Sequence, residues 1–139
     1  MSALTIVLML TAPAAAAVLP DGTSIRVRLV GVVNTDRAQK GDPLEFVVMK
    51  DVVIGNQVLI ARGARVTGQV VKAQRASAGW RPRHAKLAFA FTSAQAWDGE
   101  AVRLRRSTIT IDRGGHHHDL QWVSDADFFD AYVEGDYEL

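Results

Sequence analysis

Three consecutive histidines, His116, His117 and His118, are the residues of this chain best suited to binding a metal ion. Neutral imidazole binds zinc, copper and nickel well. Successive side chains of an extended chain point to opposite sides, so His116 and His118 could share one ion while His117 could not. The alternative is a solvated polar loop, because the run follows two glycines and lacks a spaced motif such as H-E-x-x-H.

A second candidate site is a basic stretch with one aromatic side chain, from Lys72 to Lys86. Trp80 lies there among cations that include Arg81 and Arg83. Cations beside a stacking ring suit a nucleic-acid strand or an anionic glycan. The alternative is a hairpin loop whose charges keep a sheet edge soluble. Because the N-terminus predicts export, we expect the partner to be an envelope protein or an anionic envelope component, and no nucleic acid.

The carboxylates and hydroxyls form no recognisable catalytic pattern. Asp125, Asp127 and Asp130 lack the glycine and final glutamate of an EF-hand loop, which favours capping or a solvated face over calcium binding. No G-x-S-x-G elbow supports a hydrolase. The sequence contains no cysteine, which excludes a cysteine nucleophile, a thiolate zinc site and a disulfide framework. We therefore expect no enzymatic activity and no cofactor.

The first residues of the chain predict its compartment. Met1 to Pro20 carry no charged side chain, and a short apolar run ends in alanines that fit an A-x-A cleavage site. The run is shorter than the roughly 20 residues that a membrane-spanning helix requires. We expect a signal peptide over residues 1–17 and a single domain over residues 18–139, in the periplasm or secreted, with no membrane-spanning segment after cleavage. The alternative is an uncleaved anchor.

Short alternating segments must position these candidates. Apolar residues alternate with polar ones through several stretches, which is typical of half-buried strands. The clearest are residues 24–33, 64–72, 86–96 and 101–105. Turn signals separate them, and no sustained helical periodicity follows the N-terminal segment. With 48% hydrophobic and 22% charged residues, the chain is predicted to be all-β, as a small antiparallel β-barrel or sandwich of about seven or eight strands.

The stretch from Asp51 to Val71 is the most informative about the fold. It predicts two strands joined at Gly55-Asn56, a turn at Arg62-Gly63 and a third strand. Gly68 stands inside that third strand, where a glycine leaves room for a neighbouring backbone or a large side chain. We expect these glycines to determine the fold and not to form an active site. Near the C-terminus, Phe128 to Glu134 is expected to form a closing strand.

The charge of the chain is unevenly distributed. Residues 21–106 contain fifteen Lys/Arg and seven Asp/Glu, a balance of +8, whereas residues 107–139 contain one Arg and eight Asp/Glu, a balance of −7. One interpretation is that the acidic C-terminal segment packs along the basic body, so that the charges offset each other. The other is that the body presents a basic face to an anionic partner.

The order of these motifs resembles the β-barrel domain of bacterial envelope proteins related to TrbI, which are components of conjugation and type IV secretion channels. That family combines a valine-rich strand and an L-I-P-x-G-(S/A)-x-x-x-G element with a later hairpin closed by D-G. Here Val58 to Gly68 matches the first element, with Ala61 where the family usually has proline, and Leu87 to Leu104 matches the second. The same arrangement occurs in small exported β-domain proteins, to which this short chain is more similar.

The resemblance implies a β-barrel, an envelope location and a scaffold or binding role. The expected function is therefore that of a non-enzymatic exported envelope module with a structural or interaction role. The alternative is an exported ligand- or metal-binding module that uses the loop from His116 to His118.

Overall fold

The computed structural model describes residues 17–77, 84–113 and 122–139. These residues contain 13 β-strands and no helix, which confirms the prediction of an all-β fold. Within the same ranges, no helix has the length and apolar character needed to cross a membrane.

Eleven of the strands have two to six residues, and β7 and β8 are longer, with 10 and 11 residues. In chain order they are β1 (Val18–Leu19), β2 (Ser24–Leu29), β3 (Val32–Asn34), β4 (Pro43–Val48), β5 (Val52–Ile54), β6 (Gln57–Ile60), β7 (Arg65–Gln74), β8 (Ala85–Gln95), β9 (Ala101–Arg103), β10 (Thr108–Arg113), β11 (Trp122–Ser124), β12 (Phe128–Tyr132) and β13 (Tyr137–Glu138).

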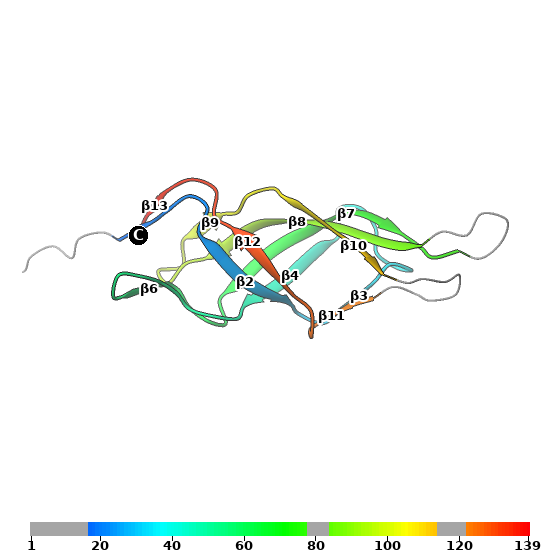
Figure 1. Cartoon of the computed structure of the whole chain (residues 1–139), viewed down its shortest axis with the longest axis horizontal. Coiled ribbons are helices and arrows are strands. Elements are labelled where there is room, and N and C mark those ends of the chain that lie inside the picture. Colours follow the sequence, from blue (N-terminus) through cyan, green and yellow to red (C-terminus); the bar gives the residue numbers. More distant parts are fainter. Residues whose placement is uncertain (1–16, 78–83, 114–121) are drawn as a thin grey trace, which may run out of the picture.

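One curled antiparallel sheet dominates the fold (Figure 1). Its strand order is β10-β8-β7-β4-β2-β12, and β9 pairs with the C-terminal part of β8. Three two-stranded ribbons accompany it: β1 with β13, β3 with β11, and β5 with β6. The β1–β13 and β5–β6 ribbons lie toward one end of the elongated molecule, and β3 and β11 lie toward the other (Figure 1).

The turns form where glycine and its neighbours predict them. Gly31 has a φ of +89° and separates β2 from β3, and Gly55 has a φ of +62° in the β5–β6 turn. A left-handed backbone conformation is accessible to glycine without the steric cost that other residues meet. The chain bends between Val48 and Val52, which separates β4 from β5.

Phenylalanine side chains fill the interior of the curled sheet. The rings of Phe46 and Phe91 have centroids 5.0 Å apart, and those of Phe89 and Phe129 are also 5.0 Å apart. Both contacts are edge-to-face, the geometry that the ring quadrupole favours. Because these rings come from β4, β8 and β12, one cluster ties together strands from across the sheet.

Gly68 allows β7 to approach β8 closely. A Cβ atom at this position would lie 2.7 Å from the carbonyl oxygen of Ala90 and 3.1 Å from the ring of Phe46. Both the neighbouring backbone and the large side chain expected beside this glycine are therefore present.

The two ends of the sheet meet at one point. Leu104 and Val133 form an isolated antiparallel bridge. The amide of Arg105 donates to the carbonyl of Tyr132 at 2.7 Å, and the amide of Glu134 donates to the carbonyl of Arg103 at 2.9 Å. The chain from β9 and the chain after β12 are thereby joined, which closes the curled sheet at this level. Beyond it, β10 and β12 are the two terminal strands of the sheet among the described residues.

The acidic C-terminal segment packs along the basic body. Strand β12 pairs with β2, and Asp130 forms an ion pair with Arg26 at 3.3 Å. Strand β10 pairs with β8, and Asp112 lies 3.8 Å from Lys86. Exposed pairs of this kind contribute at most about 1 kcal/mol each, so strand pairing and not charge holds the segment in place. The structure therefore supports the interpretation that the acidic segment packs along the basic body.

Candidate functional site

The site residues predicted from the sequence lie outside the described residues. This applies to the metal candidates His116 and His118 and to the partner-binding candidates Trp80, Arg81 and Arg83. The described part of the chain contains no group of three or more potential metal-ligating side chains. The metal and partner predictions for these residues remain predictions.

Two of the aspartates considered for calcium binding have partners within the protein. The side chain of Asp127 accepts a hydrogen bond from the amide of Ser124 at 3.0 Å and so closes the turn between β11 and β12. Asp130 is engaged with Arg26 on the face of the sheet. This agrees with the preference for capping and a solvated face.

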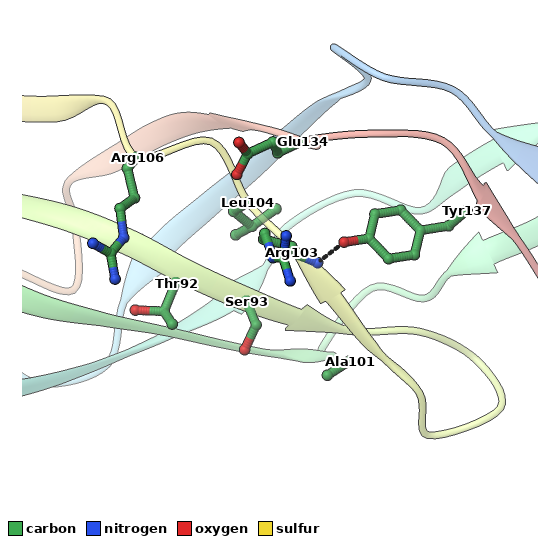
Figure 2. Close-up of a pocket in the computed structure, with 8 residues that line it drawn as sticks. All are labelled: Thr92, Ser93, Ala101, Arg103, Leu104, Arg106, Glu134 and Tyr137. Carbon is green, nitrogen blue, oxygen red and sulfur yellow. Dashed lines mark hydrogen bonds between the residues drawn. The ribbon is translucent and has the colours of Figure 1, made fainter.

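A surface pocket lies beside the point of sheet closure (Figure 2). Its volume is about 370 Å³. It is formed by β8, β9 and the segments that follow β9 and β12. The lining residues are Thr92, Ser93, Ala101, Arg103, Leu104, Arg106, Glu134 and Tyr137.

A β-bulge places two consecutive hydroxyl-bearing residues in the wall of this pocket. Along β7 and β8, Thr67 pairs with Ser93 but the next residue, Gly68, pairs with Phe91. Thr92 is therefore an extra residue on β8. Bulges change the direction of side chains, and here the consecutive residues Thr92 and Ser93 both line the pocket. The Ser93 hydroxyl also lies 3.1 Å from that of Thr67.

The charged side chains of the pocket come from the strands that meet at the closure. Arg103 stands opposite Ser93 in the β8–β9 register, and its amide donates to the Tyr137 hydroxyl at 2.8 Å. Figure 2 shows Tyr137 reaching the backbone of Arg103 from one side of the pocket, with Arg106 on the other side, near Thr92. Glu134 lies above them. The pocket thus offers two guanidinium groups, one carboxylate and several hydroxyls.

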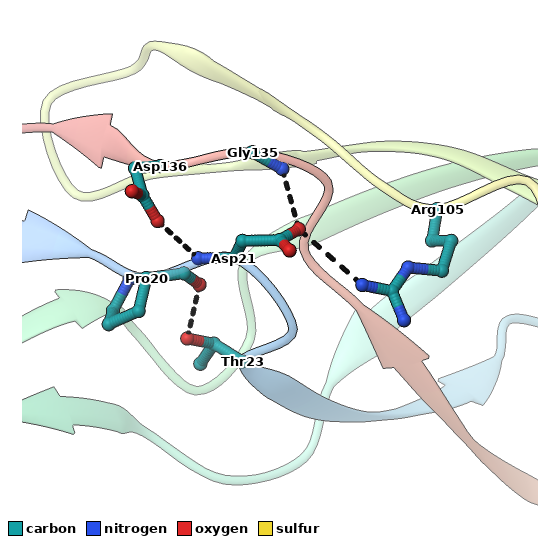
Figure 3. Close-up of polar contacts among 6 residues, drawn as sticks. All are labelled: Pro20, Asp21, Thr23, Arg105, Gly135 and Asp136. Carbon is teal, nitrogen blue, oxygen red and sulfur yellow. Dashed lines mark hydrogen bonds and ion pairs between the residues drawn. The ribbon is translucent and has the colours of Figure 1, made fainter.

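Asp21 holds the C-terminal segment beside the pocket (Figure 3). Its carboxylate accepts from the amide of Gly135 at 2.8 Å and from Arg105 Nη2 at 3.4 Å. Its own amide donates to the Asp136 carboxylate at 2.6 Å. The Gly135 amide is the main reason that the pKa of Asp21 is lowered below its ordinary 3.8, and the Arg105 charge acts in the same direction. Arg105 is thereby directed to Asp21, whereas its neighbour Arg106 lines the pocket.

A second surface combines arginine and aromatic side chains. We call the exposed side chains of Arg26, Arg28, Phe128, Asp130 and Tyr132 the β2–β12 surface. Phe128 is 54% exposed and Tyr132 is 40% exposed. Phe128 stands opposite Arg28 in the strand register, and the guanidinium of Arg26 lies 5.2 Å from the centre of its ring.

A groove adjoins the β2–β12 surface on the side of the β5–β6 hairpin. Its volume is about 670 Å³. Arg26 and Asp130 line it from the sheet, and Val53, which is 51% exposed, lines it from β5. The surface is therefore not flat, and the hairpin provides an apolar wall beside it.

The backbone of β12 presents an unpaired edge next to this surface. Val133 directs both its amide and its carbonyl to the β2 side, where they bond to Thr23 and Gly22. Because successive residues of a strand alternate in direction, the backbone groups of Phe128 and Asp130 face away from β2. Among the described strands, none pairs with that side of β12 at Phe128 and Asp130, whereas the outward carbonyl of Tyr132 accepts from the Arg105 amide at the sheet closure.

No local sequence pattern indicates either the pocket or the β2–β12 surface. Arg103 and Arg106 belong to the basic body of residues 21–106. No local pattern relates them to Glu134 or Tyr137, which follow about thirty residues later in the sequence. That relation depends on the Leu104–Val133 bridge. The aromatic residues of β12 fall in the predicted closing strand, but alternation alone does not show that its outer edge stays unpaired at Phe128 and Asp130.

No protein-family model matches the chain, and the search of curated proteins finds no significant match. Among solved structures, the chain is similar to ComB10 of the Com type IV secretion system of Helicobacter pylori, with a TM-score of 0.41 and 19% sequence identity. The similarity covers 63% of this chain and 42% of that one. The chain thus spans less than half the length of that structure.

Proposed function

We propose that this chain is a non-enzymatic, exported module of the bacterial envelope, and that it binds a protein partner at the β2–β12 surface. The motif order that resembles TrbI-like barrels supports the envelope assignment, and the alanine-rich end of the N-terminal apolar run supports export. The all-β fold is compatible with a scaffold that displays a binding surface, but a fold alone does not define a function.

The observation that carries the proposal is the exposure of Phe128 and Tyr132 on one face of a strand whose outer edge is unpaired at Phe128 and Asp130. Aromatic and arginine side chains dominate the energetics of protein interfaces. Here both kinds are held in register by the pairing of β12 with β2. A partner would therefore meet side chains whose positions are already fixed, which lowers the entropic cost of association.

The edge of β12 adds a specific mode of binding. An extended segment of a partner protein can pair with an exposed sheet edge, so that main-chain hydrogen bonds contribute to affinity. The outward backbone groups of Phe128 and Asp130 are placed for this. The exposed Trp97 and Trp122 support no comparable site, since Trp97 lies in the β8–β9 turn and Trp122 begins β11 directly after residues that the structure does not describe.

The proposal is tested by cross-linking in the bacterium that produces the chain. A photoreactive phenylalanine analogue replaces Phe128 in one strain and Gln69, an exposed residue of β7, in a control strain. We expect the protein in the periplasmic fraction, with a mature N-terminus close to Ala17. Irradiation should give one discrete protein conjugate from position 128 and none from position 69. Retention in the cytoplasm, or the same conjugates from both positions, would contradict the proposal.

A further inference from the structure

The pocket at the sheet closure is separate from the β2–β12 surface. We infer that it binds a small anionic sugar, in which Arg103 and Arg106 hold a carboxylate or phosphate group while Glu134 and Thr92 pair with sugar hydroxyls. This inference does not depend on the proposed protein partner.

The cations of the pocket are available to a ligand. Four arginines form ion pairs within the described residues: Arg26, Arg65, Arg75 and Arg105. Across that same part of the structure, neither Arg103 nor Arg106 has such a pair, although Glu134 lines the same pocket. The guanidinium group presents a planar array of donors that matches carboxylate and phosphate oxygens. With two such groups and one carboxylate, the pocket has a net charge that suits an anion.

The remaining lining suits a polyhydroxylated ligand better than an inorganic ion. The hydroxyls of Thr92 and Tyr137 and the Glu134 carboxylate offer hydrogen-bonding partners around the cations, and the exposed Ala101 supplies a small apolar part. A sugar ring has hydroxyls at its rim and C–H groups on its faces. The volume of about 370 Å³ falls within the range of roughly 300–1,000 Å³ that is typical of small-molecule sites.

The pocket is also preorganised. The Tyr137 hydroxyl accepts from the Arg103 amide, the Glu134 amide donates to the Arg103 carbonyl, and the Thr92 carbonyl accepts from the Leu104 amide at 3.0 Å. Each of these bonds involves a backbone atom at the sheet closure. The bonds therefore fix the backbone positions of the lining residues and leave the guanidinium groups available to a ligand. The backbone around the site therefore needs little ordering when a ligand binds, and the remaining entropic cost is that of immobilising the two arginine side chains.

The inference is tested by titrating the isotope-labelled exported protein with glucuronate, glucose 6-phosphate, glucose and inorganic phosphate at constant ionic strength. Amide shifts of Thr92, Ala101 and Leu104 report on the pocket. We expect at least one of the two anionic sugars to bind about tenfold or more tightly than glucose, which corresponds to one charge-assisted interaction. Comparing glucuronate with glucose 6-phosphate shows whether the group held is a carboxylate or a phosphate.

Substitution of the two arginines distinguishes binding in this pocket from nonspecific attraction of an anion to a basic protein. The Arg103→Gln/Arg106→Gln variant keeps the backbone bonds of the closure, and it should lose about tenfold or more in affinity for the anionic sugar. Arg62→Gln, which removes an exposed cation in the turn before β7 and belongs to neither site, should bind as the wild type does. Equal binding of glucose, equal binding of inorganic phosphate, or an unchanged affinity of the double variant would overturn the inference.

Discussion

Leu104 and Val133 form the bridge at which the two ends of the curled sheet meet, and neither side chain is exposed to solvent. The bridge joins the chain after β9 to the chain after β12, and both surface sites lie on the segments that it connects. The closure is therefore the structural feature on which the placement of the pocket depends.

Truncation at the bridge should reduce the free energy of unfolding. Leu104→Ala removes a fully buried side chain, and such changes cost about 2–5 kcal/mol. Urea denaturation followed by circular dichroism measures the loss. Val53→Ala, at a position that is 51% exposed, should change the stability by less than about 0.5 kcal/mol. A loss at Leu104 no larger than this control would mean that the closure contributes little to the fold.

A methyl group at position 68 should strain the contact between β7 and β8. Gly68→Ala places Cβ at 2.7 Å from the Ala90 carbonyl oxygen unless the strands move. Overpacking of this kind costs about 1–3 kcal/mol. The measurement is again the free energy of unfolding, with Gln69→Ala on the exposed face of β7 as the control. An unchanged stability would show that the strands separate here without cost.

Turns and close approaches could be predicted from the sequence, whereas long-range placement could not. Gly55 and Gly68 each fulfil the role expected of them, because the conformation or space that a glycine supplies is a local requirement. The bridge between Leu104 and Val133 joins residues far apart in sequence, and no local pattern specifies that pairing. The bulge at Thr92 is equally hidden, since apolar alternation through β8 gives no sign of an extra residue.

The ionised form of Asp21 should stabilise the fold. Its pKa is lowered in the folded protein, mainly by the Gly135 amide and also by Arg105, so its contribution is present above the ordinary value of 3.8 and is lost as the pH falls through the folded pKa. The difference in stability between wild type and Asp21→Asn should therefore be largest near neutral pH and shrink in acid.

Denaturation curves between neutral pH and pH of about 2 test this behaviour, and a carboxyl titration by nuclear magnetic resonance gives the folded pKa directly. Glu100→Gln, which removes another exposed carboxylate, is the control. A midpoint for Asp21 at or above 3.8 would contradict the assignment of its partners.

Proline scanning should distinguish the two edges of β12. Ala131→Pro removes an amide that faces β2 at a position only 1% exposed, so we expect a loss of about 3 kcal/mol or more. Asp130→Pro removes an amide that faces away from β2, and edge positions tolerate proline. Its cost should be clearly smaller. Equal losses in chemical denaturation would mean that the outer edge of β12 is already paired.

The central claim is that the β2–β12 surface binds a protein, and the most direct measurement is the affinity of the purified partner captured at position 128. Isothermal titration calorimetry compares the wild type with Arg28→Glu, which reverses one exposed charge of the surface, and with Arg62→Glu, which does so in the turn before β7. We expect Arg28→Glu to weaken binding about tenfold or more, while Arg62→Glu binds as the wild type does. The same Kd for all three proteins would contradict the account.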